Sequence, residues 1–201
     1  VHIFTEQRPS CVPLPGLGVR VWGAAFTEKH RGAPLAGFHA EKDGDMLDLM
    51  VLHGEVGNPA SEYGPIAEAD LAGSGMDYVA LGHVHAFSGL RRAGNTFYAW
   101  PGCPEGRGFD ETGPKGVILA TLSPGRCEAE LIPIARRRYE IALVDLTDAA
   151  DPLEAVLAAL PEEERPFMDG GFRMGFDGYV DALLGTGFRG TIESPLLSRM
   201  I

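Results

Sequence analysis

An apolar run that ends in a glycine and two histidines constrains the fold of this chain most. Residues 78–81 (YVAL) lead directly into Gly82, and His83 and His85 follow, one residue apart. A short uninterrupted apolar run is typical of a strand that is buried on both faces of a sheet. Gly82 permits a sharp break in the backbone because it has no Cβ atom. The histidines therefore follow the carboxyl end of a buried strand, where open α/β sheets bind their ligands.

A second stretch has the same design. Residues 48–52 (DLMVL) are followed by His53 and Gly54, and residues 65–71 between the two runs have helical spacing. This order predicts a strand, a helix and a second, parallel strand joined by a right-handed crossover. Adjacent parallel strands would bring His53, His83 and His85 to one rim of the sheet. Neutral imidazole binds divalent zinc, iron and related ions, so the sequence predicts a metal site at this rim.

The remaining pattern predicts an α/β protein with a small appended domain. Arg136, Arg137 and Arg138 form a charge run that we interpret as a solvated linker rather than a DNA contact, and it sets the boundary between domains 1–135 and 136–201. A helix is expected from Asp151, which is placed to cap it, with an apolar stripe through Leu160. The other expected strands cover residues 1–4, 18–23, 95–100, 116–122, 127–134 and 139–146.

Composition narrows the class of protein and its location. The 201 residues carry a formal net charge of −11, which excludes a general polyanion-binding surface but not an enzyme that holds a polyanion through metal ions. The three cysteines lack CxxC spacing, which argues against a disulfide framework or structural zinc and favours a reducing cytoplasm. No apolar run reaches the roughly 18 residues of a membrane span, and no signal peptide opens the chain. Because the chain begins at Val1 rather than Met, we expect it to start inside a larger protein.

Four motifs in this order resemble a known family. They are residues 52–54 (LHG), 77–85 (DYVALGHVH), 98–107 (YAWPGCPEGR) and 111–116 (ETGPKG). Together they resemble the latter half of the calcineurin-like metallophosphoesterases, and within them the SbcD-like bacterial DNA repair exonucleases. The resemblance runs from about Val1 to Ile134. It implies part of a layered βα sandwich, followed after Arg136 by a small α+β capping domain that guides DNA.

The resemblance also implies a site with two divalent metal ions. His53 and His83 would bind one ion and His85 the other, with manganese expected first and iron, zinc or magnesium as alternatives. Ions about 4 Å apart can clamp a phosphodiester and generate a hydroxide. The family also has Asp-x-His, Gly-Asp-x-x-Asp and Gly-Asn-His-Asp motifs nearer its amino terminus, and the resemblance of this chain does not include them. The letters Gly-Asp-x-x-Asp do occur at residues 44–48, but there they fall in a predicted turn and the start of the strand that leads to His53. Three neutral imidazoles cannot offset two divalent charges, so we expect an incomplete ligand set, no catalytic residue of the chain's own and an isolated chain that is inactive.

The resemblance implies metal-dependent phosphodiester hydrolysis, as a DNA exonuclease in repair. The partners that it implies are DNA and an SMC-like ATPase. It implies no contact with a membrane, and it leaves open whether the chain forms a homodimer. Arg107, in a glycine-flanked loop, is a candidate phosphate contact, with a surface charge as the alternative. Glu55 and Asn58 follow His53, and we interpret them as a solvated loop. The alternative functions are a metallophosphatase for small phosphoesters, a degenerate scaffold without catalysis, and a mononuclear zinc hydrolase that uses the three histidines alone.

Overall fold

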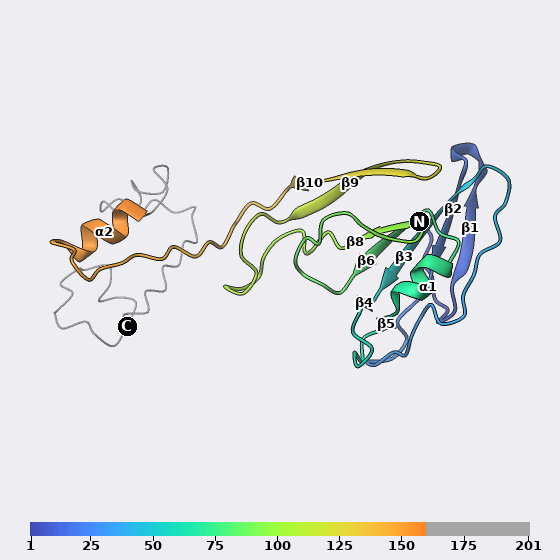
Figure 1. Cartoon of the computed structure of the whole chain (residues 1–201), viewed down its shortest axis with the longest axis horizontal. Coiled ribbons are helices and arrows are strands. Elements are labelled where there is room, and N and C mark those ends of the chain that lie inside the picture. Colours follow the sequence, from blue (N-terminus) through green and yellow to red (C-terminus); the bar gives the residue numbers. More distant parts are fainter. Residues whose placement is uncertain (160–201) are drawn as a thin grey trace. The chain divides into compact units, whose positions relative to one another are not determined.

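The computed structural model describes residues 1–159, which include a mixed sheet (Figure 1). The six-stranded sheet has the order β1-β2-β3-β6-β8-β7. Strands β2, β3, β6 and β8 are parallel to one another, and the edge strands β1 and β7 pair antiparallel with β2 and β8. This architecture confirms the predicted α/β class. The strands are β1 (Ser10–Leu14), β2 (Val19–Gly23), β3 (Leu47–His53), β6 (Tyr78–Gly82), β7 (Arg91–Ala93) and β8 (Thr96–Ala99).

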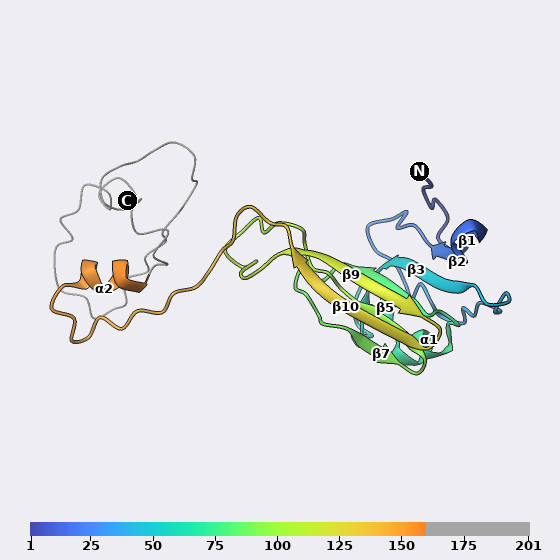
Figure 2. The same ribbon diagram turned by 90° about the horizontal axis from the view of Figure 1, so that it is seen from above.

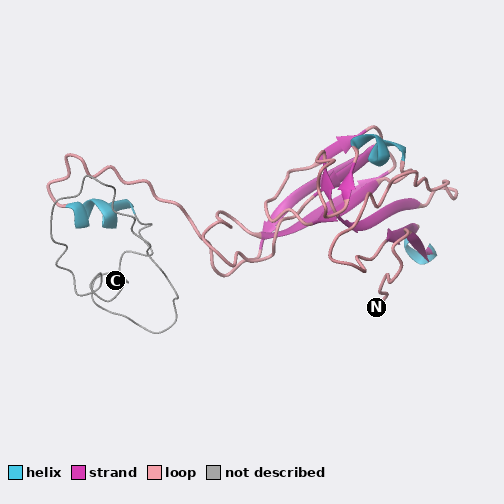
Figure 3. Ribbon diagram, turned by 90° about the horizontal axis from the view of Figure 1, so that it is seen from below, coloured by secondary structure: helices cyan, strands magenta, loops and turns pink. Residues whose placement is uncertain are grey.

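The two histidine-bearing strands are adjacent, as the sequence predicted. In the parallel pairing of β3 with β6, Leu49 lies opposite Tyr78 and His53 lies opposite Gly82. The connection contains α1 (Glu68–Gly73), one of the short helices that Figure 3 shows among the strands. The helix begins later than expected, because Pro65–Ile66 forms β5, which pairs with β4 (Glu55–Val56). Within residues 1–159, no helix has the length and apolar character needed to cross a membrane.

Apolar side chains cover the two faces of β6 differently. On one face Met50, Leu52, Val79 and Leu81 pack with Leu71 of α1 in the main core. On the other face a hairpin packs over Tyr78 and Ala99 through the side chains of Ile118, Leu122, Cys127 and Ala129. Its strands are β9 (Gly116–Ser123) and β10 (Arg126–Pro133), which form a layer of their own beside the sheet (Figure 2). Burial on both faces explains why the sequence of β6 is continuously apolar.

The hairpin face of the sheet is not covered along its whole width. Val51 of β3 shares this face with Ala80, its partner in the register, yet 45% of its surface is exposed. Leu14 of β1 is also exposed on this face. On the hairpin itself Val117 and Leu119 are exposed, the latter by 59%. Exposed apolar side chains therefore remain on the hairpin side of the sheet and on the hairpin itself.

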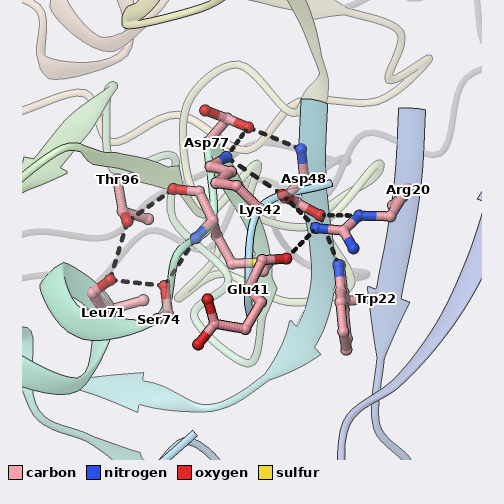
Figure 4. A network of polar contacts seen from close by, with 10 residues as sticks. Arg20, Trp22, Glu41, Lys42, Asp48, Leu71, Ser74, Asp77 and Thr96 are labelled. Atoms are coloured by element: carbon pink, nitrogen blue, oxygen red, sulfur yellow. Dashed lines mark hydrogen bonds and ion pairs between the residues drawn. The ribbon is translucent and has the colours of Figure 1, made fainter. Parts of the chain in front are cut away.

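A buried carboxylate joins the amino-terminal ends of the strands, away from the histidines (Figure 4). Asp48 is fully buried and accepts hydrogen bonds from Arg20 at 2.8 and 2.9 Å and from the indole of Trp22 at 2.9 Å. The Nζ atom of Lys42 lies 3.2 Å from Oδ2 of Asp48. Burial raises the pKa of Asp48, but these donors outweigh burial and the net pKa is lowered. Asp77 accepts a 2.7 Å hydrogen bond from the backbone N–H of Asp48.

Several expected elements differ in the structure. Residues 1–4 form no strand; the edge strand is Ser10–Leu14, whose Pro13 is tolerated because an edge strand needs fewer ladder donors. Residues 139–146 form no strand either, and Tyr139 makes only an isolated bridge to Thr112. Helix α2 (Pro152–Ala159) begins as predicted, with the Asp151 carboxylate accepting from the N–H of Leu153 at 2.9 Å. Leu160, the last member of its predicted stripe, lies outside the described residues.

The chain divides into two units, Val1–Ile141 and Ala142–Ile201. The first contains the sheet and the hairpin, and the second contains α2 among its described residues. The predicted domains 1–135 and 136–201, and the capping role of the second, stay predictions.

Candidate metal centre

The first pair of predicted metal ligands meets at the carboxyl ends of β3 and β6. His53 is the last residue of β3, and His83 directly follows β6. The Nε2 atom of His53 lies 3.2 Å from the Nδ1 atom of His83, and the ring centroids are 5.1 Å apart. The sheet therefore brings these two imidazoles together, as the sequence predicted.

The backbone around this pair is unusual. Among residues 1–159, His83 is the non-glycine residue with a positive φ, at 108°. Such a conformation costs on the order of 1–3 kcal/mol and is concentrated at functional sites. A Cβ atom on Gly82 would lie 3.1 Å from Nδ1 of His53, which is tighter than an ordinary contact. Glycine at this position therefore lets the His53 ring lie against the end of β6.

Neighbouring side chains support both rings. Phe26 packs edge-on against His53, with the ring centroids 5.1 Å apart. Tyr63 stacks on His83 at 5.4 Å. The Oε2 atom of Glu55 lies 3.9 Å from Nε2 of His83, while Asn58 donates a 3.1 Å hydrogen bond to Oε1 of Glu55. The structure thus places Glu55 beside the histidine pair, whereas the sequence interpretation put it in a solvated loop.

The indole of Trp100 holds the two histidine-bearing turns together. Its Nε1–H donates to the carbonyl oxygens of Gly54 at 3.1 Å and Gly82 at 3.2 Å. The N–H of Gly54 also donates to the carbonyl of Gly82 at 3.2 Å. Trp100 is a core residue, but the sequence pattern does not predict its bifurcated hydrogen bond. An indole N–H inside a core needs an acceptor, and that is the signal that could have revealed the contact.

His85 has different partners. Its Nδ1 atom contacts the Oε1 atom of Glu111, and its backbone carbonyl accepts a 3.0 Å hydrogen bond from Nζ of the buried Lys115. Cys103 donates to the same carbonyl at 3.7 Å. The imidazole itself is 67% exposed. Glu111 and Lys115 both belong to the 111–116 motif, which the resemblance singled out without assigning them a role.

The electrostatics of the site favour neutral His53 and ionised Glu111. Burial is the main cause that lowers the pKa of His53, and the nearby His83 and His85 lower it further. The neutral imidazole is the form that binds metal ions. The backbone N–H of Arg107 is the main cause that lowers the pKa of Glu111, followed by His85. Arg107 makes this contact through its backbone, whereas its side chain is exposed, and its proposed phosphate contact stays a prediction.

The donor atoms fit part of a metal coordination shell. His53 and His83 present two imidazole nitrogens to one another, and imidazole suits zinc, iron and manganese. A catalytic ion needs three or more protein ligands, so the pair fits as a portion of a larger set. Within residues 1–159, no three His, Cys, Asp or Glu side chains are arranged to hold an ion.

Comparison with known proteins gives one informative match. No model of a protein family matches this chain. It is 36% identical over 154 residues to the uncharacterized metallophosphoesterase YhaO of Bacillus subtilis (strain 168). The match includes 74% of this chain but 38% of that relative. The chain therefore spans less than two fifths of the length of the protein that it resembles.

Proposed function

We propose that this chain, as a member of the metallophosphoesterase superfamily, supplies part of a metal site that hydrolyses phosphodiesters at DNA ends. The identity to YhaO supports the superfamily and, with it, metal-dependent phosphoester hydrolysis. The observation that carries the proposal is the 3.2 Å approach of His53 and His83 at the ends of adjacent parallel strands. In this assignment His53 and His83 hold one divalent ion and His85 holds the second.

The chain's own residues would orient the ligands. The lowered pKa of His53 keeps its ring in the metal-binding form at neutral pH. Trp100 fixes the turns that carry His53 and His83, and Lys115 and Glu111 fix His85. The ions, with manganese preferred over iron, zinc or magnesium in this proposal, would supply charge stabilisation and an activated water.

The remaining wall of the site would come from elsewhere in the protein. Parallel sheets are normally covered on both faces, yet Val51 and Leu14 are exposed on the hairpin side of this sheet. We propose that a further layer covers this face and brings carboxylate ligands to the two ions. This proposal agrees with the partial coverage of YhaO. It predicts that the 201-residue chain alone is inactive.

The substrate assignment rests on the sequence resemblance. A net charge of −11 gives the chain no general attraction for a polyanion, so the ions would carry most of the contact with phosphate. Arg107 is the candidate for an additional phosphate contact. In this proposal the protein acts in the cytoplasm on DNA, with residues 136–201 guiding the duplex and an SMC-like ATPase as partner.

The test compares the 201-residue chain with the complete gene product that contains it. Hydrolysis of bis(p-nitrophenyl) phosphate and of end-labelled duplex DNA is measured with manganese, and bound metal is counted by elemental analysis. We expect two ions per chain and turnover of both substrates in the complete protein only. H53A, H83A and H85A should each lower turnover at least 100-fold, since each removes a ligand.

The control is H39A, because His39 bonds the carbonyl of Gly73, at the end of α1. Robust turnover by the 201-residue chain would contradict the proposal that some of the metal ligands come from outside it. Turnover of the small ester without cleavage of DNA would favour a small-molecule phosphatase. A complete protein that binds no manganese would favour the scaffold alternative, and one ion per chain would favour the mononuclear hydrolase.

A further inference from the structure

Glu111 uses its two carboxylate oxygens for two different donors. Oε1 contacts Nδ1 of His85, and Oε2 accepts a 2.6 Å hydrogen bond from the backbone N–H of Arg107. The side chain is only 12% exposed, although it lies in a loop. The carboxylate is therefore largely shielded from water and has a defined donor on each oxygen, although the His85 ring itself is exposed.

The polarity of these contacts determines the tautomer of His85. A backbone N–H can only donate, so Oε2 must accept from Arg107. An ionised carboxylate has no proton to donate, so Nδ1 of His85 must carry the hydrogen in its contact with Oε1. In a neutral imidazole the lone pair is then on Nε2.

We propose that Glu111 is a positioning residue that holds His85 in the Nδ1–H tautomer and so presents Nε2 to a metal ion. A carboxylate on the far nitrogen of a metal-ligating histidine fixes both the tautomer and the orientation of the ring. The metal part of this inference rests on the proposed function; the tautomer part does not.

The backbone of His85 is fixed by the same segment of chain. Lys115 and Cys103 both donate to its carbonyl oxygen. A Cβ atom on Gly102 would lie 2.8 Å from that oxygen, so only glycine allows residue 102 to pass so close. Residues 102–115 therefore hold His85 by its carbonyl oxygen and by Nδ1. None of these contacts involves Nε2, the ring atom that would face a metal ion.

Substitution of Glu111 by glutamine gives a sharp test, because glutamine has one acceptor and one donor group. Its oxygen should remain on the N–H of Arg107, since an amide NH₂ cannot accept a hydrogen bond. The NH₂ group then faces Nδ1 of His85 and requires a lone pair there. E111Q should therefore invert the tautomer to Nε2–H, whereas E111D retains a carboxylate acceptor.

The measurement is the long-range ¹H–¹⁵N correlation spectrum of the metal-free 201-residue chain, at a pH where the imidazole is neutral. We expect Nδ1–H for His85 in the parent and in E111D, and Nε2–H in E111Q. The matched control is D110N, which removes the same charge from the adjacent, exposed Asp110. Manganese is then titrated into the complete protein that contains the chain, parent or variant, and broadening of the His85 ring signals is followed. E111Q should raise the manganese concentration for half-broadening by about 10- to 100-fold, and D110N should not.

The two parts can fail separately. An Nε2–H tautomer in the parent would overturn the inference without any variant, and so would an unchanged tautomer in folded E111Q. If the tautomer inverts but manganese broadens no histidine in the parent, the proposed metal site fails while the action of Glu111 on His85 stands. If H85A weakens manganese binding and E111Q leaves it unchanged, the positioning role fails and the metal site survives.

Discussion

The Nε2 atom of His53 lies 3.2 Å from the Nδ1 atom of His83, although 30 residues separate them in the chain. The pairing of β3 with β6 produces this approach, because it sets His53 opposite Gly82. His53 is therefore held by the sheet itself, and His83 by the turn that directly follows β6. In the proposed metal site, this preorganisation of the two rings would reduce the cost of binding an ion.

Replacing Trp100 by phenylalanine should disturb the histidine pair. W100F removes the N–H that bonds the carbonyls of Gly54 and Gly82, at a cost of about 1–3 kcal/mol in the free energy of unfolding. Urea denaturation measures this loss, and NMR spectra should show shifted ring signals of His53 and His83.

The matched control is W22F, which also removes an indole hydrogen bond, here a partly buried one to Asp48 at the other end of the sheet. W22F should destabilise the fold and leave the ring signals of His53 and His83 unchanged. Equal effects of the two variants on those signals would show that Trp100 has no specific influence on the site.

The backbone of His83 should make this position costly for any residue with a side chain. At φ 108°, glycine avoids a strain of about 1–3 kcal/mol. Its greater conformational freedom in the unfolded chain lowers the free energy of unfolding and offsets part of this gain. H83G should therefore be more stable than H83A by about 1 kcal/mol, and neither variant should bind metal at this position. Thermal unfolding of the two variants decides the matter, and a more stable H83A would show that the backbone is not strained.

The pKa of His53 should depend on its histidine neighbours. Burial, His83 and His85 lower it, so H83A should move it back toward the ordinary value in an NMR titration. A control substitution, H39A, should leave it in place.

The sign of the stability effect follows from the direction of the shift. Because the folded chain resists protonation of His53, this contribution to stability is complete above the unfolded pKa of about 6.5 and declines as the pH falls through it. A His53 that titrates above the ordinary range would contradict the site geometry.

Asp48 should govern the acid stability of the sheet. Because the pKa of Asp48 is lowered by folding, its stabilising contribution to the free energy of unfolding is complete above the unfolded pKa of about 3.9. This contribution is lost as the pH falls through the folded pKa. D48N should cost about 2–3 kcal/mol at neutral pH, because a donor group then faces Arg20 or Lys42. Denaturation in urea at several pH values should show a smaller acid-dependent loss in D48N than in the parent. The exposed Asp45 offers the control: a D45N variant with the same loss would remove the special role of Asp48.

Local patterns in the sequence predict the elements that carry the site. The apolar runs before His53 and His83 predict adjacent buried strands, because a strand covered on both faces must be apolar throughout. Asp151 predicts the start of α2, because a capping carboxylate acts within three residues of the chain.

The support of the site could not be read from local patterns. The contact of His85 with Glu111 spans 26 residues, and that of Trp100 with Gly54 spans 46. Both depend on how a loop and a core residue pack in three dimensions. The edge strand β1 was missed for a related reason, since Pro13 weakens the strand pattern and only its pairing with β2 reveals it.

The register between β3 and β6 has a consequence of its own. Side chains alternate between the two faces of a strand, so a slip of one residue would turn His53 toward the helix-covered side and bring Leu52 to the rim in its place. The bond from the N–H of Gly54 to the carbonyl of Gly82 extends the ladder past the last strand residue and opposes such a slip. Strand pairing and the approach of His53 to His83 thus depend on the same alignment, so a misaligned conformer would lack the histidine pair altogether.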